Sequence, residues 1–277
     1  MAEFSPMMQQ YLSIKEQYKD AILFFRLGDF YEMFFEDAIL ASRELEITLT
    51  GKECGQEERA PMCGVPFHAV DSYVSKLIEK GYKVAICEQL EDPKVTKGMV
   101  KRDVIRIVTP GTVIESNMLD EKKNNYIMSV YKKGIYFGIA ICDVSTGDFY
   151  STKIVENNNF ATLLDELAKF SPAEIVVNSF LYSSTEEINE IRKRFNVYIN
   201  SLDDENFKDD KETLLENYNL EYENKKIENL DNYQLETVAI NGLLAYLRQT
   251  QKMKLDHINH IKFYNLQKYM ALDITAR

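Results

Sequence analysis

The order of apolar and polar positions divides the chain into short buried runs and longer amphipathic segments. Within the first 115 residues, short apolar runs predict strands at 22–25, 47–50, 84–87 and 104–109. Apolar residues spaced three and four apart predict core-facing helices at 6–18, from about 31 to 45, and at 69–80. This alternation of strands and helices is typical of an α/β domain.

The later part of the chain opens with strands instead of a helix. Hairpin turn signals join the predicted strands 126–131, 135–144 and 149–152. Helices predicted at 158–170, 185–194 and 232–250 then alternate with strands at 174–177 and 197–199. Three antiparallel strands followed by alternating helices and strands indicate a ribonuclease-H-like sheet, a layout that other α/β folds share.

The sequence therefore predicts two α/β domains, at 1–115 and 126–252, joined by a polar linker at 116–125. Residues 201–229 are rich in acids and asparagine, so they predict a mobile surface segment with at most one helix. Residues 253–277 contain apolar groups with no obvious partner and end without a helix stop signal. We therefore expect the chain to be the N-terminal piece of a longer protein.

The stretch 28–34, Gly-Asp-Phe-Tyr-Glu-Met-Phe, crowds aromatic and acidic residues where the first strand is predicted to become a helix. Asp29 and Glu32 fit a capping box at the start of that helix. Phe30 lies off the apolar stripe, in the first turn, where a side chain can project past the helix end. From the residues alone, packing of Phe30 on a neighbouring loop is favoured over a functional exposure.

Residues 51–66 predict a loop region. The part at 51–59 is polar and contains Lys52, and the part at 61–66 has two prolines that bracket a glycine, which excludes regular structure there. Met62 is either presented at the surface or fills a gap in the core, and the core position is the commoner one.

Composition and charge narrow the class of protein. The net charge of −11 argues against a stand-alone binder of duplex nucleic acid, because nonspecific affinity comes mainly from phosphate neutralisation. A solvated loop and edge strand explain the one basic run at least as well as a DNA contact does. That run, interrupted by Asp103, consists of Lys94, Lys97, Lys101, Arg102 and Arg106. No apolar run could cross a bilayer and no signal peptide is evident, so we expect a soluble, cytoplasmic protein without a membrane partner.

Candidate catalytic and metal-binding chemistry is sparse. The four cysteines lack CxxC spacing and suit reduced thiols, which disfavours a zinc site from Cys54, Cys63, His68 and Cys87. The chain has no phosphate-binding loop, dinucleotide fingerprint or HExxH motif. The best enzyme candidate is Asp143, which ends a strand where a ribonuclease-H-like nuclease would hold a metal. Ordinary turn chemistry explains an aspartate there equally simply.

Four motifs in order resemble one family: Gly28-Asp29-Phe30-Tyr31-Glu32, Pro61-Met62-x-Gly64-x-Pro66-x-His68, Ala85-Ile86-Cys87-Glu88-Gln89, and Arg106-Ile107-Val108-Thr109-Pro110-Gly111-Thr112. Together they are similar to the MutS family of bacterial DNA mismatch-recognition proteins. The resemblance implies a mixed-sheet mismatch-binding domain, a ribonuclease-H-like connector domain, and the start of a core or lever domain at 253–277, which fits residues 272–277. Clamp and ATPase domains would lie beyond Arg277. ATP and magnesium are implied only for that ATPase, so in this chain we expect no cofactor, no metal and no enzyme activity.

The resemblance also implies a set of DNA-binding residues. Phe30 and Glu32 match a Phe-x-Glu motif that enters the minor groove at a mispair. A carboxylate near DNA repels phosphate, so Glu32 would help only if protonated or sharing a hydrogen bond with a base edge. Lys52 and Arg102 match basic residues that contact the DNA backbone, although the family often has arginine where this chain has Lys52. Met62 matches the loop that faces the groove.

The implied partners are mismatched duplex DNA and, through the connector domain, MutL. The parent protein would be a homodimer and this piece of it a monomer. Two alternatives remain open on the sequence: a metal-dependent nuclease that uses Asp143, and a protein-interaction module that docks a partner through Phe30.

Overall fold

The protein is described by a computed structural model that covers residues 3–91, 98–119, 123–155 and 159–266. The chain divides into two compact units, the first up to Pro110 and the second from Gly111 onward, except that Thr250–Met253 group with the first. Within the described ranges, no helix has the length and apolar character needed to cross a membrane.

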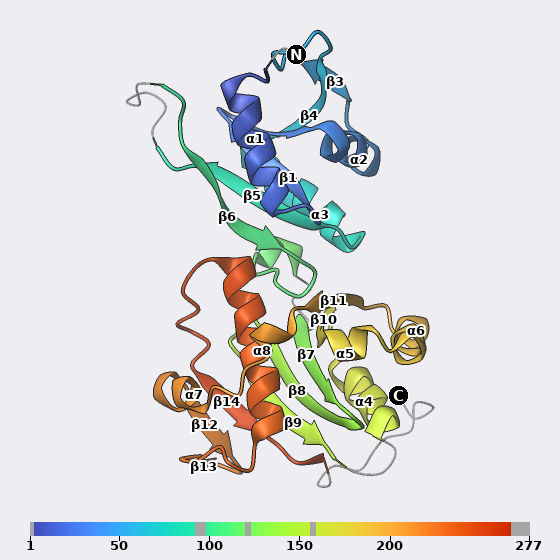
Figure 1. Ribbon diagram of the computed structural model, residues 1–277, viewed down its shortest axis with the longest axis vertical. Coiled ribbons are helices and arrows are strands. Elements are labelled where there is room, and N and C mark those ends of the chain that lie inside the picture. The colour runs from blue at the N-terminus through green and yellow to red at the C-terminus, as the bar shows by residue number, and fades with distance from the viewer. Residues whose placement is uncertain (1–2, 92–97, 120–122, 156–158, 267–277) are drawn as a thin grey trace. The chain divides into compact units, whose positions relative to one another are not determined.

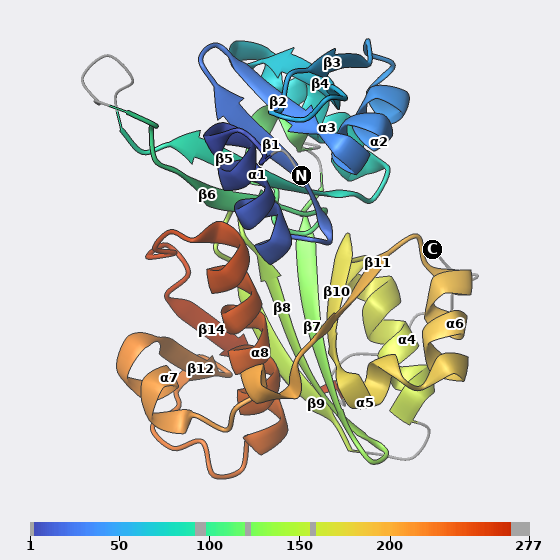
Figure 2. The same ribbon diagram turned by 45° about the horizontal axis from the view of Figure 1, so that its top comes forward.

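The first unit is a mixed six-stranded sheet with helices on both faces (Figures 1 and 2). Its strand order is β3-β4-β2-β1-β5-β6, and β1 runs parallel to β5 while the other neighbouring pairs are antiparallel. The strands are β1 (Ala21–Leu27), β2 (Phe30–Phe34), β3 (Thr50–Lys52), β4 (Ala60–Pro66), β5 (Lys83–Gln89) and β6 (Arg102–Val108). The helices are α1 (Pro6–Gln17), α2 (Phe35–Leu45), the short η1 (Phe67–Ala69) and α3 (Val70–Glu79).

Helix α1 covers one face of this sheet through an aromatic core. The ring of Tyr11 meets Phe25 and Phe34 edge-on, with centroids 5.5 and 4.9 Å apart. Its hydroxyl donates to Oδ2 of Asp37 at 3.2 Å, and the same oxygen accepts the backbone N–H of Leu23 at 3.0 Å. These bonds join α1, β1 and the first turn of α2 around one buried carboxylate.

The stretch 28–34 forms a hairpin turn and strand β2, so the predicted helix start is wrong. Leu27 pairs with Phe30 in the antiparallel β1–β2 ladder, and Gly28 at the turn has a φ of +58°, which glycine adopts without strain. Helix α2 begins only at Phe35. Asp29 and Glu32 therefore form no capping box, because pairing of β2 with both β1 and β4 outweighs the helical spacing of its aromatic residues.

Residues 61–66 are also regular structure, contrary to the predicted loop, because they belong to β4. The two prolines lie where one of the neighbouring ladders has ended. Pro61 pairs with Gly51 of β3, whereas the ladder to β2 ends at Met62, and Pro66 is the last residue of the strand. Proline is tolerated at such positions because its missing N–H is not needed on both sides.

The second unit has an eight-stranded sheet in the order β11-β10-β7-β8-β9-β14-β12-β13. Its strands are β7 (Tyr126–Lys133), β8 (Tyr136–Asp143), β9 (Phe149–Ile154), β10 (Glu174–Asn178), β11 (Tyr198–Leu202), β12 (Asn219–Tyr222), β13 (Lys225–Lys226) and β14 (His260–Phe263). The helices are η2 (Ser116–Met118), α4 (Asn159–Phe170), α5 (Ser179–Tyr182), α6 (Thr185–Arg194), η3 (Asp204–Asn206), α7 (Lys211–Asn217) and α8 (Gln234–Gln251).

Strands β7 to β11 have the topology predicted from the sequence. β8 is antiparallel to β7 and β9, whereas β10 and β11 continue parallel to β7 on the other side. Helix α8 covers one face of this sheet, and α4 and α6 cover the other (Figure 2). Side chains such as Ile127 and Ala140 belong to the core on the α8 side, and Met128 and Ile139 belong to the core on the α4 and α6 side. The prediction of two α/β domains, the second of ribonuclease-H-like layout, is confirmed.

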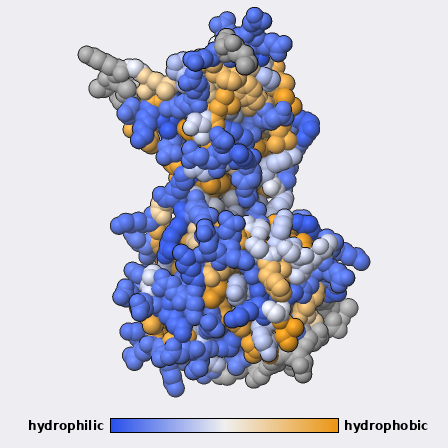
Figure 3. All heavy atoms as spheres, viewed as in Figure 1, coloured by the Kyte–Doolittle hydropathy of each residue, from blue (hydrophilic) through white to orange (hydrophobic). Residues whose placement is uncertain are grey.

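Two parts of the second unit are more ordered than the sequence suggested. The acidic segment 201–229 contains α7, β12 and β13, where at most one helix was predicted. Strand β14 pairs with β9 and β12, so the sheet extends past residue 252, where the sequence analysis ended the second domain. The lever segment was predicted at 253–277, but its residues 260–263 are β14 of this sheet, and residues 267–277 lie outside the described residues. On the face seen in Figure 3, hydrophilic side chains dominate and hydrophobic ones lie in separate patches.

Candidate DNA-contacting site

All five predicted site residues lie on one face of the sheet of the first unit, since the Arg102 guanidinium lies over the ring of Phe25, which is opposite Glu32. Residues opposite each other in neighbouring strands point to the same side, and alternate residues of one strand share a face. The register places Phe30 opposite Pro66, Phe34 opposite Met62, and Lys52 opposite Ala60. It follows that Phe30, Glu32, Lys52 and Met62 all project from the face that carries Phe34.

Phe30 is the first residue of β2 and directly follows the hairpin turn. Its side chain is 47% exposed, whereas Tyr31, on the opposite face, is buried. Exposure of about half of a phenylalanine side chain is costly in water, at roughly 25 cal/mol per Å² of apolar surface. Phe30 is therefore only partly covered by its neighbours, and about half of its surface is open to a ligand.

Glu32 and Lys52 form a close ion pair beside Phe30. The Lys52 ammonium donates to Oε2 of Glu32 at 2.5 Å and lies 5.8 Å from the ring centroid of Phe34. The Glu32 side chain is 15% exposed and that of Lys52 33%. Gly64, opposite Glu32 in β4, adds no side chain to the space between them. The predicted basic contact and the predicted carboxylate are thus one charge-neutral pair.

Met62 and Arg102 have packing roles that the sequence left open. Met62 is half-buried and packs against the aromatic core below α1. Arg102 is 9% exposed, and its guanidinium donates to the carbonyls of Arg26 and Val100 and to the side-chain oxygen of Gln10. Burial lowers the pKa of Arg102 from its usual value. A guanidinium in this setting has little surface to offer a phosphate, and of Lys94 and Lys97 in the same basic run nothing is described.

A cluster on the opposite face anchors the hairpin, and the sequence analysis missed it. The hydroxyl of Tyr31 donates to Glu88, and Nη1 of Arg26 lies 3.6 Å from the same carboxylate. The Arg26 guanidinium also stacks 3.9 Å from the ring centroid of Phe67. Burial and the neighbouring Glu88 raise the pKa of Tyr31 above its usual value, so its hydroxyl stays a donor. The signal was a charged residue directly after each of two apolar runs, 22–25 and 84–87.

Asp143 has the ordinary turn role that the sequence offered as its alternative. Its Oδ1 accepts the N–H and hydroxyl of Ser145 at 2.9 and 2.6 Å, and its Oδ2 accepts the N–H of Asn125 at 3.0 Å. Among the described residues, no three His, Cys, Asp or Glu side chains are grouped as a metal site would require. The geometry therefore does not favour a metal-dependent nuclease.

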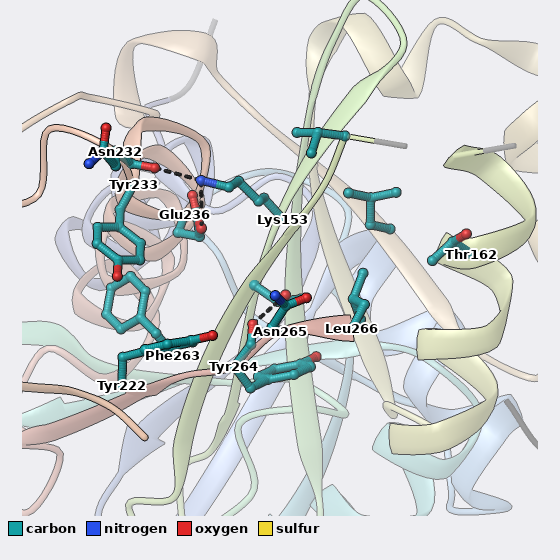
Figure 4. Close-up of a pocket in the computed structure, with 13 residues that line it drawn as sticks. Lys153, Thr162, Tyr222, Asn232, Tyr233, Glu236, Phe263, Tyr264, Asn265 and Leu266 are labelled. Atoms are coloured by element: carbon teal, nitrogen blue, oxygen red, sulfur yellow. Dashed lines mark hydrogen bonds and ion pairs between the residues drawn. The ribbon is translucent and has the colours of Figure 1, made fainter. Parts of the chain in front are cut away.

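The second unit contains a pocket of about 350 Å³ between β9, the start of α8 and the residues that follow β14 (Figure 4). The Lys153 ammonium lies 3.4 Å from Oε1 of Glu236 and donates to the carbonyl of Asn232 at 2.5 Å. Oε2 of Glu236 is buried without a hydrogen-bond partner, and burial raises the pKa of this carboxyl group. Tyr233 and Phe263 line the wall edge-to-face at 5.1 Å. No motif in the sequence pointed to this pair.

Comparison with known proteins places both units in one family. The family model of MutS domain I matches residues 5–117, and that of MutS domain II matches residues 125–261. The DNA mismatch repair protein MutS of Acetivibrio thermocellus is 59% identical over 277 residues, which are 100% of this chain and 32% of that protein. MutS of Ruminiclostridium cellulolyticum is 56% identical over 278 residues, 100% of this chain and 31% of its own.

A third relative agrees with these two. MutS of Clostridium tetani is 49% identical over 276 residues, which are 99% of this chain and 30% of that protein. The chain thus spans about a third of the length of the relatives it matches. The two domain matches follow the same order as the two structural units, and together they cover most of the chain. The chain therefore belongs to the MutS family.

Proposed function

We propose that this chain recognises mispaired or unpaired bases in duplex DNA and so initiates mismatch repair. Phe30 enters the minor groove as an aromatic wedge, and Glu32 contacts a base edge beside it. The observation that carries the proposal is the pairing of a half-exposed phenyl group with a carboxylate two residues later on one sheet face. The family membership of the chain supports it.

Deformation energy provides the selectivity in this mechanism. An inserted apolar side chain unstacks a base step and kinks the duplex, at a cost of a few kcal/mol per step. A mispaired step costs less to deform than a paired one, so the same wedge binds it more tightly. The wedge has to be held rigidly, because a mobile side chain would avoid the paired step instead of deforming it, and the difference in deformation energy would not affect binding. The ladders on both sides of β2 and the Tyr31–Glu88 hydrogen bond supply that rigidity.

The remaining parts of the function belong to the whole protein. We propose that the whole protein acts as a homodimer in the cytoplasm and that the second unit binds MutL. Its ATPase, which uses ATP and magnesium, would lie in the two thirds of the relatives' length that this chain does not span. In that scheme the chain itself is not an enzyme, needs no cofactor and, taken alone, is a monomer. Its net charge of −11 fits a part of the protein that contacts the mispair, while other parts supply most of the affinity for the DNA backbone.

Competition between mispaired and fully paired duplex tests the proposal in the full-length gene product. Phe30→Ala is expected to abolish the preference for the mispair while overall folding is kept. Phe180→Ala removes an equally exposed phenylalanine, 53% against 47%, from α5 of the second unit and serves as the matched control. An unchanged preference in Phe30→Ala would rule out the wedge and favour a protein-docking role for this side chain.

A further inference from the structure

The ion pair between Glu32 and Lys52 gives Lys52 a role that its charge alone does not suggest. A lysine on a DNA-facing surface is usually interpreted as a phosphate contact. Each such contact makes the slope of log affinity against log salt steeper by about 0.9. Here its ammonium lies 2.5 Å from a carboxylate oxygen that is only slightly exposed. The two charges cancel, so the pair as a whole offers little attraction to a phosphate and little repulsion.

Three features hold this pair in place. Both side chains project from the same face of the sheet, from strands β2 and β3, which are separated only by β4. The Phe34 ring lies 5.8 Å from the ammonium on the core side. Gly64, opposite Glu32, leaves the carboxylate free to lie flat towards β3, since it carries no side chain. A Cβ there would lie 3.5 Å from Cγ of Glu32 and 3.3 Å from the carbonyl oxygen of Tyr31, so any larger residue would crowd this path.

We propose that Lys52 is a positioning residue for Glu32 and not a contact to the DNA backbone. This inference rests on the proposed function above. Lys52 fixes the direction of the carboxylate relative to Phe30 and neutralises its charge while the duplex approaches. At a mispair, one carboxylate oxygen stays with Lys52 and the other is available to a base edge, because a carboxylate accepts several hydrogen bonds. Lys52 thereby affects discrimination between duplexes more than total affinity.

A double-mutant cycle on the full-length gene product tests this. The observable is the ratio of affinities for mispaired and paired duplex, in wild type, Lys52→Met, Glu32→Gln and the double variant. Lys52→Met is expected to lower the ratio about tenfold, the worth of a charge-assisted hydrogen bond. In the Glu32→Gln background the same change should leave the ratio as it is. Lys52→Arg keeps charge and donors and should retain most of the preference.

The salt dependence of binding separates positioning from phosphate contact. If Lys52 contacted phosphate, Lys52→Met would weaken both duplexes equally and reduce the slope of log affinity against log salt by about one. Positioning leaves that slope unchanged. Lys19→Met removes a charge from the same unit, on a side chain that is 75% exposed, and is the matched control for loss of charge.

Three results would overturn the inference. A wild-type protein with no preference for mispairs would remove the proposed function and this role together. A wild-type preference that Lys52→Met leaves intact, in a variant with unchanged thermal unfolding, would remove the positioning role alone. Equal loss of affinity for both duplexes in Lys52→Met, with a shallower salt dependence, would show that Lys52 contacts the DNA backbone.

Discussion

The guanidinium of Arg102 donates a hydrogen bond of 2.7 Å to the carbonyl oxygen of Arg26, joining the first residue of β6 to the end of β1. The same group donates to Val100 and Gln10 and lies 5.1 Å from the ring centroid of Phe25. Arg102 thus fixes the end of the sheet next to the hairpin that carries Phe30. Its position in a basic run suggested DNA contact, whereas its surroundings indicate a structural role.

Replacing Arg102 is therefore expected to reduce stability more than electrostatic attraction to DNA. Arg102→Met leaves two carbonyl acceptors without their donor, and we expect the free energy of unfolding to fall by about 2–3 kcal/mol. Urea unfolding of the first unit measures this, with Lys101→Met, an exposed neighbour, as the control. A variant as stable as wild type but with a shallower salt dependence of DNA binding would contradict the structural role.

The four cysteines are buried and free, and we expect them to be unreactive in the folded protein. Burial raises the pKa of the Cys63 and Cys87 thiols to about 12 and that of Cys142 above its usual range. The thiolate is the reactive form, so at pH 8 almost none is present at Cys63, Cys87 and Cys142, and burial shields Cys54 from a reagent. A disulfide reagent such as Ellman's should react slowly with native protein and with all four thiols after denaturation. Fast reaction of even one native thiol would contradict the burial of these side chains.

Glu236 should make stability depend on pH in a defined direction. Burial raises its pKa in the folded state above the ordinary value of 4.5, so the folded protein binds this proton more tightly than the unfolded chain does. Stability from this group is therefore greatest at low pH and falls as pH rises through the interval above 4.5. Glu236→Gln cannot ionise and should gain stability relative to wild type as pH is raised from 4 to about 7.

Urea unfolding of Glu236→Gln and wild type across that pH range measures the difference. Glu205→Gln, on the exposed turn η3, is the control and should follow wild type at every pH. A constant difference between Glu236→Gln and wild type would mean that Glu236 titrates alike in the folded and unfolded states.

How far the sequence predicts this fold depends on whether local and distant interactions agree. In the second unit, the apolar runs 126–131 and 135–144 are separated by the turn signal Lys133-Gly134, so the pairing of these two strands was predictable from adjacent sequence. Residues 30–34 fit both a helical spacing and a strand alternation, and the choice is made by β1 and β4. Strand β14 pairs with β9, more than 100 residues earlier in the chain, which no local pattern reveals.

The candidate site divides in the same way. Phe30, Glu32, Lys52 and Met62 were found through motif resemblance, but the sequence placed Glu32 and Lys52 in separate roles. Their pairing at 2.5 Å depends on the order of β2, β4 and β3 in the sheet, which brings residues 20 positions apart together. The contact of Arg26 and Glu88 with Tyr31 was not predicted, because each of the two charged residues looks like a solvated strand end in the sequence.

The two-residue period of β2 constrains how this protein can change. Ladders on both sides fix its register, so one residue inserted within the strand, between Phe30 and Glu32, cannot be absorbed by sliding. It would place Phe30 and Glu32 on opposite faces of the sheet, because alternate residues of one strand share a face. The spacing of two residues between Phe30 and Glu32 is therefore what keeps both side chains on one face, whereas the turn before Phe30 can change its length without reversing either of them.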